Sequence, residues 1–459
     1  MIYSSKSNEN IQIIPRYKKK IKKLNNLKTA RIYVALFLAI LLIGFYYYFR
    51  EHIVVRLDIP LKSNVKKENL KKYMMQELDH IGYIEPELQV TLDERIIHLD
   101  LKGAPPKISY FSRLFPLIAE LGGTGILIEY EDMFPYNGTI LKNVSALNAY
   151  SLKEITIINR LARENNLKVI PLIQTFGHLE FLLKLQQYKD YREVFAYPQV
   201  ICPSHPHTMS LIEDMIDQII ASHPDIEMLH IGCDEVYYLG FCERCTNRMI
   251  NDNVSKNLLF LEHVKAISQI LNKKYPHIRI LLWDDQFRSM TETDLAEVKL
   301  NENLEPVIWR YTKEVYDELG PSLWDMYSKI FRKVWIASAY KGAIGSNKYM
   351  SDVNHYLQNH RSWLSVVAEH KRRVNFRGII MAGWQRYDHF AVLCELLPIG
   401  IPALAMSLRL LKGFKDSPLS PPTEVSKVLK CHQPYGLIGS AFGSPKCEFP
   451  GTYIFHFAV

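Results

Sequence analysis

Short β-branched and apolar runs recur along most of the chain, and a longer segment with helical periodicity follows each of them. Residues 151–166 and 211–223 are examples of such helical segments. Eight alternating units over about 320 residues predict the α/β class and a closed (β/α)8 TIM barrel, and they favour it over a doubly wound open sheet. The eight predicted strands are residues 95–102, 125–131, 168–174, 227–233, 279–285, 306–311, 333–339 and 378–384.

The N-terminal region differs from the rest. Residues 1–31 carry nine Lys and Arg and one acid, and residues 32–49 contain no charge. At about 1.5 Å per residue, the uncharged stretch is long enough to cross a hydrocarbon core. With the basic residues on the cytosolic side, this predicts a single-pass type II membrane protein whose larger part is lumenal or extracellular. The predicted organisation is a basic cytosolic tail (1–31), a transmembrane signal anchor (32–49), a stem (50–92), a catalytic barrel (93–413) and an irregular C-terminal tail (414–459).

Charge and cysteine content exclude several function classes. The formal net charge is +8, and the first 31 residues account for all of it, so the remaining chain is neutral and no nucleic-acid partner is expected. Seven cysteines without regular spacing do not form a disulfide framework. Cys242 and Cys245 form one C-x-x-C without a second pair, so a surface loop, disulfide-bonded in an oxidising lumen, is favoured over a zinc site. No metal and no cofactor are expected, and the oligomeric state is not indicated.

In a parallel barrel, chemistry lies at the carboxyl ends of the strands. The residues at the predicted strand ends are mostly carboxylates and aromatic side chains, and phosphate-binding loops, H-E-x-x-H and G-x-S-x-G motifs are absent. Pyranose rings stack on aromatic faces, and glycosidic cleavage needs a carboxylic acid near the leaving oxygen. The pattern therefore predicts a carbohydrate site. The strand-end residues are Lys102, Glu131, Asp132, residues 174–178, Asp234, Glu235, residues 283–285, Trp309, Tyr311, Tyr340, Lys341, Trp384 and Arg386.

Several of these segments resemble a known family. "HIGCDEVYYLG" is similar to the H-x-G-x-D-E signature of the family-20 β-N-acetylhexosaminidases. "LKGAPPK", "IEYEDMFPY", "PLIQTFGHLEF", "ASAYKGA" and "GWQRYDHF" resemble one branch of this family, hexosaminidase D, more closely. The resemblance extends from about His98 to Gly413 and implies an exo-acting glycoside hydrolase that removes terminal N-acetylhexosamine from a glycan or glycoconjugate.

The resemblance also implies the catalytic roles. In this family the 2-acetamido oxygen of the substrate attacks C1, and an oxazolinium intermediate forms with retention of configuration. By motif position, Glu235 is the general acid and base, and Asp234 holds the acetamido N–H. Because two close carboxylates do not both ionise easily, Asp234 is also expected to keep Glu235 protonated. His178 matches the histidine that links an acidic residue to the catalytic acid, and the preferred partner is Glu131, with Asp132 as the alternative.

The substrate-binding positions of the family match this sequence less completely than the catalytic ones. Trp283, Trp309 and Trp384 match tryptophans that wall the acetamido pocket and the sugar face, although each also fits a barrel core. Tyr340 is one candidate for holding the acetamido oxygen, and a tyrosine without substrate contact is the alternative. Two positions depart from many relatives: Lys102 replaces an arginine, and Arg386 stands where an acid is common. Both bear on the sugar hydroxyls, and the branch resemblance favours galacto-configured substrates.

Two other functions remain open from the sequence. One is a catalytically idle carbohydrate-binding barrel, which the retention of Asp234, Glu235 and His178 disfavours. The other is a retaining glycosidase with a protein nucleophile, for which Asp285 is the nearest candidate carboxylate.

Overall fold

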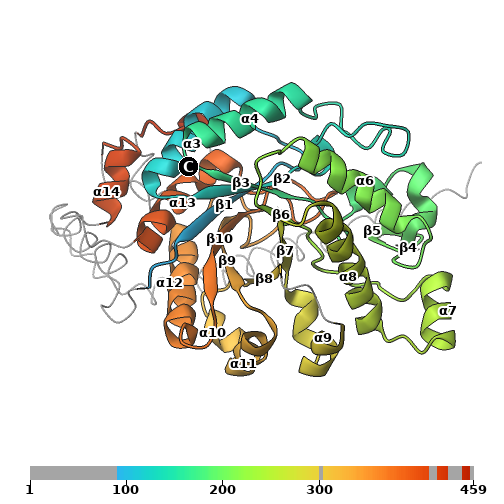
Figure 1. Ribbon diagram of the computed structural model, residues 1–459. Coiled ribbons are helices and arrows are strands. Elements are labelled where there is room, and N and C mark those ends of the chain that lie inside the picture. The colour runs from blue at the N-terminus through green and yellow to red at the C-terminus, as the bar shows by residue number, and fades with distance from the viewer. Residues whose placement is uncertain (1–89, 299–302, 413–420, 433–446, 455–459) are drawn as a thin grey trace, which may run out of the picture. The chain divides into compact units, whose positions relative to one another are not determined.

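The computed structural model describes residues 90–298, 303–412, 421–432 and 447–454. Within them, eight parallel strands form a closed barrel in the order β1-β10-β9-β8-β7-β6-β3-β2 (Figure 1). All eight predicted strands are confirmed, and the closed order excludes the doubly wound sheet. The barrel strands are β1 (Glu94–Asp100), β2 (Gly125–Glu129), β3 (Lys168–Leu172), β6 (Met228–His230), β7 (Arg279–Trp283), β8 (Leu304–Trp309), β9 (Val334–Lys341) and β10 (Phe376–Gly383).

Helices cover the outside of the barrel (Figure 1). Their starts follow local sequence: Ser151 accepts a hydrogen bond from the backbone N–H of Glu154, whose side chain bonds back to Ser151, and so begins α4 with a capping box. The helices are α3 (Ile108–Leu121), α4 (Leu152–Glu164), α5 (Glu180–Leu183), α6 (Thr208–Ala221), α7 (Glu243–Asn251), α8 (Lys256–Lys274), α9 (Glu292–Val298), α10 (Val315–Glu318), α11 (Pro321–Ile330), α12 (Val353–His370), α13 (Leu397–Lys412) and α14 (Pro421–Val428).

Apolar side chains fill the interior of the barrel. Ile96, Leu127, Leu281 and Ile380 belong to one buried cluster that runs through it, and Trp283 lies in the same cluster. Trp309 and Trp384 are partly buried and pack against this cluster. The barrel is therefore a packed core, and its tryptophans form an apolar floor at the carboxyl ends of the strands.

Several strands end earlier than the sequence predicts. β2 ends at Glu129, and Glu131–Met133 forms a short 3-10 helix. β6 ends at His230 because Gly232 and Cys233 adopt positive φ angles of 68° and 72°, which extended strand backbone does not have. Residues expected at strand tips thus lie in tight turns after the strands.

An insertion after β3 was not predicted. An antiparallel hairpin of β4 (Arg192–Val194) and β5 (Tyr197–Ile201) lies between β3 and α6. It is fastened to the preceding loop, because the backbone N–H of Ile201 donates to Phe176 and that of Leu179 donates to Gln199. The hairpin therefore stands beside the loop that carries His178.

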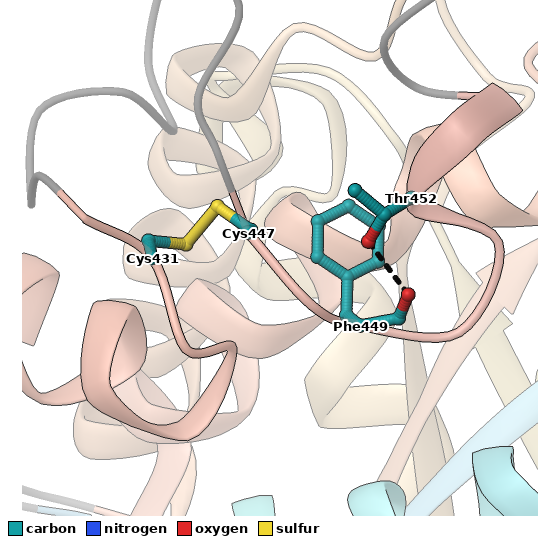
Figure 2. The surroundings of a disulfide bond; sticks show 4 residues. All are labelled: Cys431, Cys447, Phe449 and Thr452. Carbon is teal, nitrogen blue, oxygen red and sulfur yellow. Dashed lines mark hydrogen bonds between the residues drawn. A yellow bond between two sulfur atoms is a disulfide. The ribbon is translucent and has the colours of Figure 1, made fainter.

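Part of the C-terminal region is also described. Helix α14 packs on α13 and α3, and Arg409 forms a 3.0 Å ion pair with Glu424. Beyond α14, a disulfide joins Cys431 to Cys447, and the Thr452 hydroxyl donates to the carbonyl of the buried Phe449 (Figure 2). The region that was expected to be irregular thus contains a helix and a cross-link.

The membrane topology predicted from the sequence is corrected here. Among the described residues, no helix combines the length and the apolar character that crossing a bilayer requires. Residues 32–49, the predicted anchor, lie outside the described residues, as do the cytosolic tail and all but the end of the stem. The prediction of a single-pass type II protein is not retained.

Candidate active site

A cavity of about 230 Å³ opens at the carboxyl ends of the barrel strands. It brings together side chains that are as much as 285 positions apart in the sequence. Ten of the strand-end residues predicted from the sequence line it, with four further residues. The predicted ones are Lys102, Gln174, His178, Asp234, Glu235, Trp283, Trp309, Tyr311, Trp384 and Arg386, and the others are Glu129, Gly342, Ala343 and Tyr387.

His178 lies between the adjacent carboxylates. Its Nε2 is 3.2 Å from Oε2 of Glu235 and 3.6 Å from Oδ2 of Asp234. The Asp234 side chain is 9% exposed, whereas that of Glu235 is 31% exposed. Asp234 therefore sits deep in the cavity, and Glu235 faces the opening, where a leaving group would depart.

The backbone explains how the two loops come this close. A Cβ at Gly177 would lie 2.2 Å from the carbonyl oxygen of Asp234, so only glycine allows the approach. His178 and Glu235 have positive φ angles of 52° and 50°. Non-glycine residues rarely adopt this conformation, and such strain is typical of functional sites.

The three groups have strongly perturbed proton affinities. Burial raises the pKa of Asp234 to about 7, with opposition from His178 and support from Asp285. Burial alone would raise the pKa of Glu235, but hydrogen bonds with His178 and Tyr237 hold it below its ordinary value. Burial disfavours the charged form of His178, yet the carboxylates outweigh it and raise the pKa of His178 to about 10.

This arrangement differs from the expectation that Asp234 keeps Glu235 protonated. The imidazolium of His178 is closer to Glu235 than to Asp234 and stabilises the Glu235 carboxylate. In the free site Asp234, rather than Glu235, is therefore the carboxyl group whose pKa is raised.

Asp285 is a support rather than a lining group. Its Oδ2 accepts the backbone N–H of Glu235 at 3.0 Å, and its Oδ1 accepts the indole N–H of Trp309 at 3.1 Å. Gln286 donates a third hydrogen bond to Oδ2. Asp285 thus fixes both the loop that carries Asp234 and Glu235 and one wall of the cavity.

A second support lies one residue earlier. The buried Asp284 pairs with Arg288 and accepts the hydroxyl of Tyr327 at 3.0 Å. Arg288 also donates to the carbonyl of Trp309 and lies over its ring, 5.3 Å from the centroid. These contacts hold Trp309 from behind.

The acid that reaches the cavity from β2 is Glu129. It contacts His98 at 3.0 Å and Lys102 at 3.3 Å, and the charge of Lys102 together with the His98 hydrogen bond outweighs the effect of burial and lowers the pKa of Glu129. Glu131 instead lies 3.0 Å from His389 and does not line the cavity. Within the described parts of the chain, His178 pairs with Asp234 and Glu235 and not with Glu131.

The other predicted residues outside the cavity also have structural partners. Asp132 lies 2.9 Å from Lys184 and 3.5 Å from His389. Tyr340 is fully buried, and its hydroxyl donates to the carbonyl of His98, whereas Tyr311 lines the cavity beside Trp309. Tyr311 is therefore better placed than Tyr340 to reach a substrate.

Four lining residues carry buried polar atoms that have no hydrogen-bond partner within the described parts of the chain. They are Asp234 Oδ1, Gln174 Oε1, Trp283 Nε1 and Arg386 Nε. A buried polar group without a partner costs free energy, so such atoms mark places where a ligand could bond.

Among the residues that the structure describes, two groups of side chains have the spacing of metal ligands. Glu131, Asp132 and His389 form one, but Lys102 and Lys184 already neutralise these carboxylates. Glu193, Cys202, Cys242 and Cys245 form the other, and none of its members lines the cavity.

Comparisons with known proteins agree with the geometry. The family model described as "Glycosyl hydrolase family 20, catalytic domain" matches residues 120–387 of this chain. Hexosaminidase D of Bos taurus is 46% identical over 318 residues, which are 69% of this chain and 91% of the relative. Hexosaminidase D of Homo sapiens is 45% identical over 325 residues, which are 70% of this chain but only 66% of the relative.

Solved structures share the fold. The exo β-N-acetylglucosaminidase of Vibrio harveyi superposes with a TM-score of 0.53 at 17% identity, over 74% of this chain and 57% of that chain. The N-acetyl-β-hexosaminidase of Streptomyces plicatus superposes with a TM-score of 0.52 at 16% identity, over 75% of this chain and 68% of that chain. The family match spans more than half of the 459 residues, and this chain belongs to glycosyl hydrolase family 20.

Proposed function

We propose that this chain is an exo-acting β-N-acetylhexosaminidase that uses the acetamido group of its substrate as the nucleophile. The observation that carries the proposal is the Asp234–Glu235 pair with His178 between them, in a cavity walled by three tryptophans. The substrate class is a glycan or glycoconjugate with a terminal N-acetylhexosamine. No protein nucleophile and no cofactor are needed for this reaction.

The burial of the two carboxylates suits two different roles. Asp234 Oδ1 is buried and lacks a partner among the described residues, so an acetamido N–H can donate to it. Holding this N–H orients the acetamido oxygen toward C1 and stabilises the positive charge that develops on the acetamido group. Glu235, nearer the opening, protonates the leaving oxygen and then takes a proton from water.

Substrate binding should reverse the proton distribution in the free site. An acetamido N–H favours ionised Asp234, because it donates to the carboxylate. A sugar over Glu235 removes water from its half-exposed side chain and favours the neutral acid. The single proton of the pair then resides on Glu235, where the reaction needs it.

The contacts of Asp285 argue against a protein nucleophile. Both of its oxygens accept hydrogen bonds from the protein, and the residue does not line the cavity. A nucleophile must approach the anomeric carbon directly, which Asp285 could do only by releasing the backbone of Glu235. The idle-barrel alternative lacks a comparable observation, because the acid, its partner and the walls are all present.

Glu235→Gln should lower kcat about 10²-fold or more on substrates with poor leaving groups, since general-acid assistance is lost. The loss should be smaller with an activated nitrophenyl leaving group. Glu227→Gln, an exposed residue just before β6 at the other end of the barrel, is the control and should leave kcat unchanged. Near-normal turnover of a natural glycoside by Glu235→Gln would rule out its role as the acid.

The pH profile of kcat/KM reports the proton that the pair shares. With the pKa of Asp234 at about 7, the pair loses this proton above about pH 7, and kcat/KM should fall on that side. His178→Gln removes a positive charge that favours ionisation, so the alkaline limb should move to higher pH. His277→Gln, at an exposed position, is the control. A His178→Gln enzyme with reduced activity and an unmoved limb would assign His178 a purely structural role.

A thiazoline mimic of the oxazolinium intermediate distinguishes the two retaining mechanisms. We expect potent competitive inhibition, because Asp234 can bond the ring nitrogen as it bonds the acetamido N–H. Inhibition should weaken strongly in Asp234→Ala. If the mimic binds no more tightly than N-acetylhexosamine, the mechanism with a protein nucleophile is favoured.

Arg386 is proposed to read the sugar hydroxyls and to favour galacto-configured substrates. It lines the cavity, donates to the carbonyl of His389 at 2.9 Å and has only donors to offer a hydroxyl. N-acetylgalactosaminides should be hydrolysed at least as well as N-acetylglucosaminides. Arg386→Ala should reduce this discrimination by about 1–3 kcal/mol, measured as the ratio of kcat/KM values. Arg372→Ala, an exposed site on the outside of the barrel, is the control, and an unchanged ratio in folded Arg386→Ala would exclude the role.

A further inference from the structure

Three thiols and one carboxylate meet outside the catalytic cavity. Glu193 lies in β4, Cys202 follows β5, and Cys242 and Cys245 lie at the start of α7. One ligand atom from each lies within 4.8 Å of all the others. The C-x-x-C motif thus obtains, through the hairpin, the additional ligands that the sequence alone did not reveal.

Two of the separations within the cluster are close to those of a tetrahedral site, and the third is shorter. Cys202 Sγ lies 3.2 Å from Cys242 Sγ and 3.7 Å from Cys245 Sγ. Cys245 Sγ lies 3.3 Å from Oε2 of Glu193. Zinc with Zn–S bonds of about 2.3 Å and Zn–O bonds of about 2.0–2.2 Å sets its ligands about 3.8 Å (S···S) and 3.5 Å (S···O) apart.

The cluster is also preorganised. Glu193 is 2% exposed, and its Oε1 accepts backbone N–H groups of Gly240, Phe241 and Cys242, which turns Oε2 toward the sulfurs. The N–H of Cys245 donates to Sγ of Cys242 at 3.3 Å, a contact that stabilises a thiolate. Cys202 and Cys245 are fully buried. The three N–H donors satisfy Oε1, so Oε2 is the oxygen that faces the sulfurs, where a cation shared with them would be stabilised.

We propose that Glu193, Cys202, Cys242 and Cys245 bind one structural zinc ion. Three sulfurs and one oxygen complete a four-coordinate shell, as in closed structural sites. On binding, the thiols release their protons to solvent. Soft thiolates favour zinc over magnesium or calcium.

A disulfide explains the cluster less well. The sulfur of Cys202 is farther from both other sulfurs than the roughly 2.05 Å of a covalent S–S bond, and all three cysteines are free in the structure. One disulfide would also leave the third thiol, and Oε2 of Glu193 beside it, unexplained.

The position of the cluster gives the ion a role. It would join the hairpin, which is bonded to the His178 loop, to the segment that begins seven residues after Glu235. The two loops that carry the catalytic groups would then be held together from outside the cavity. This inference is independent of the proposed activity.

The test uses the full chain, purified under reducing conditions after exposure to zinc sulfate and removal of the excess. Elemental analysis should find about one zinc per chain, and titration with a mercurial should release it, as read with a zinc-sensitive dye. Cys242→Ser should lose most of the zinc. Glu193→Gln, which keeps an oxygen for the three backbone N–H groups, should weaken zinc binding about 10–100-fold. Cys394→Ser, a buried cysteine outside the cluster, should retain the metal.

Two results would overturn the proposal. One is wild-type protein that holds no zinc after this treatment, or holds copper or iron in its place. The other is a peptide map of unreduced, zinc-exposed protein in which Cys202 is disulfide-bonded to Cys242 or Cys245. If Cys242→Ser does not fold, the mercurial titration of the wild type and the Glu193→Gln affinity still decide the question.

Discussion

The arrangement of side chains at the mouth of the barrel depends on the ion pairs that His178 forms with Asp234 and Glu235. Several carboxylates converge there, and burying them is tolerable only if each has a cation or N–H donors nearby. Asp284 has Arg288, Glu129 has Lys102 and His98, and Asp285 has three N–H donors. His178 serves the remaining two, Asp234 and Glu235, at once. This sharing leaves one oxygen of Asp234 without a partner among the described residues, and the proposed function assigns it to a substrate amide.

The barrel could be predicted because parallel strands buried on both faces appear as short continuous apolar runs. The eight runs are easy to recognise, and so are the amphipathic helices between them. The exact strand ends are harder, since they depend on a few backbone angles. In "GILIEYED" three acids follow one another, and the sequence pattern does not show which one ends the strand. The structure assigns the end to Glu129, and therefore the inference that Glu131 contacts His178 has no support in the geometry.

The aromatic residues illustrate the same limit. Tyr311 and Tyr340 both stand near strand ends, and the sequence does not distinguish them. In the structure Tyr340 points into the protein and bonds His98, whereas Tyr311 stacks beside Trp309 at the cavity. The cluster around Cys242 could not be predicted for a related reason. Glu193 and Cys202 come close to the C-x-x-C motif only because of the β4–β5 hairpin, which the pattern of apolar residues does not predict.

The two catalytic loops are joined on the inside as well as near the cysteine cluster. The Thr175 hydroxyl donates to the carbonyl of Ile231 at 2.7 Å, and His263 of α8 contacts the carbonyl of Thr175 at 2.9 Å. Gly177 lets the His178 loop rest against Asp234. Because a shift of about 1 Å can remove much of the catalytic advantage of a positioned group, a site built on loops needs such fastening. The contacts of Thr175, Gly177 and Asp285 supply it from three directions, which explains how strained backbone at His178 and Glu235 can persist in a barrel whose strands end several residues earlier.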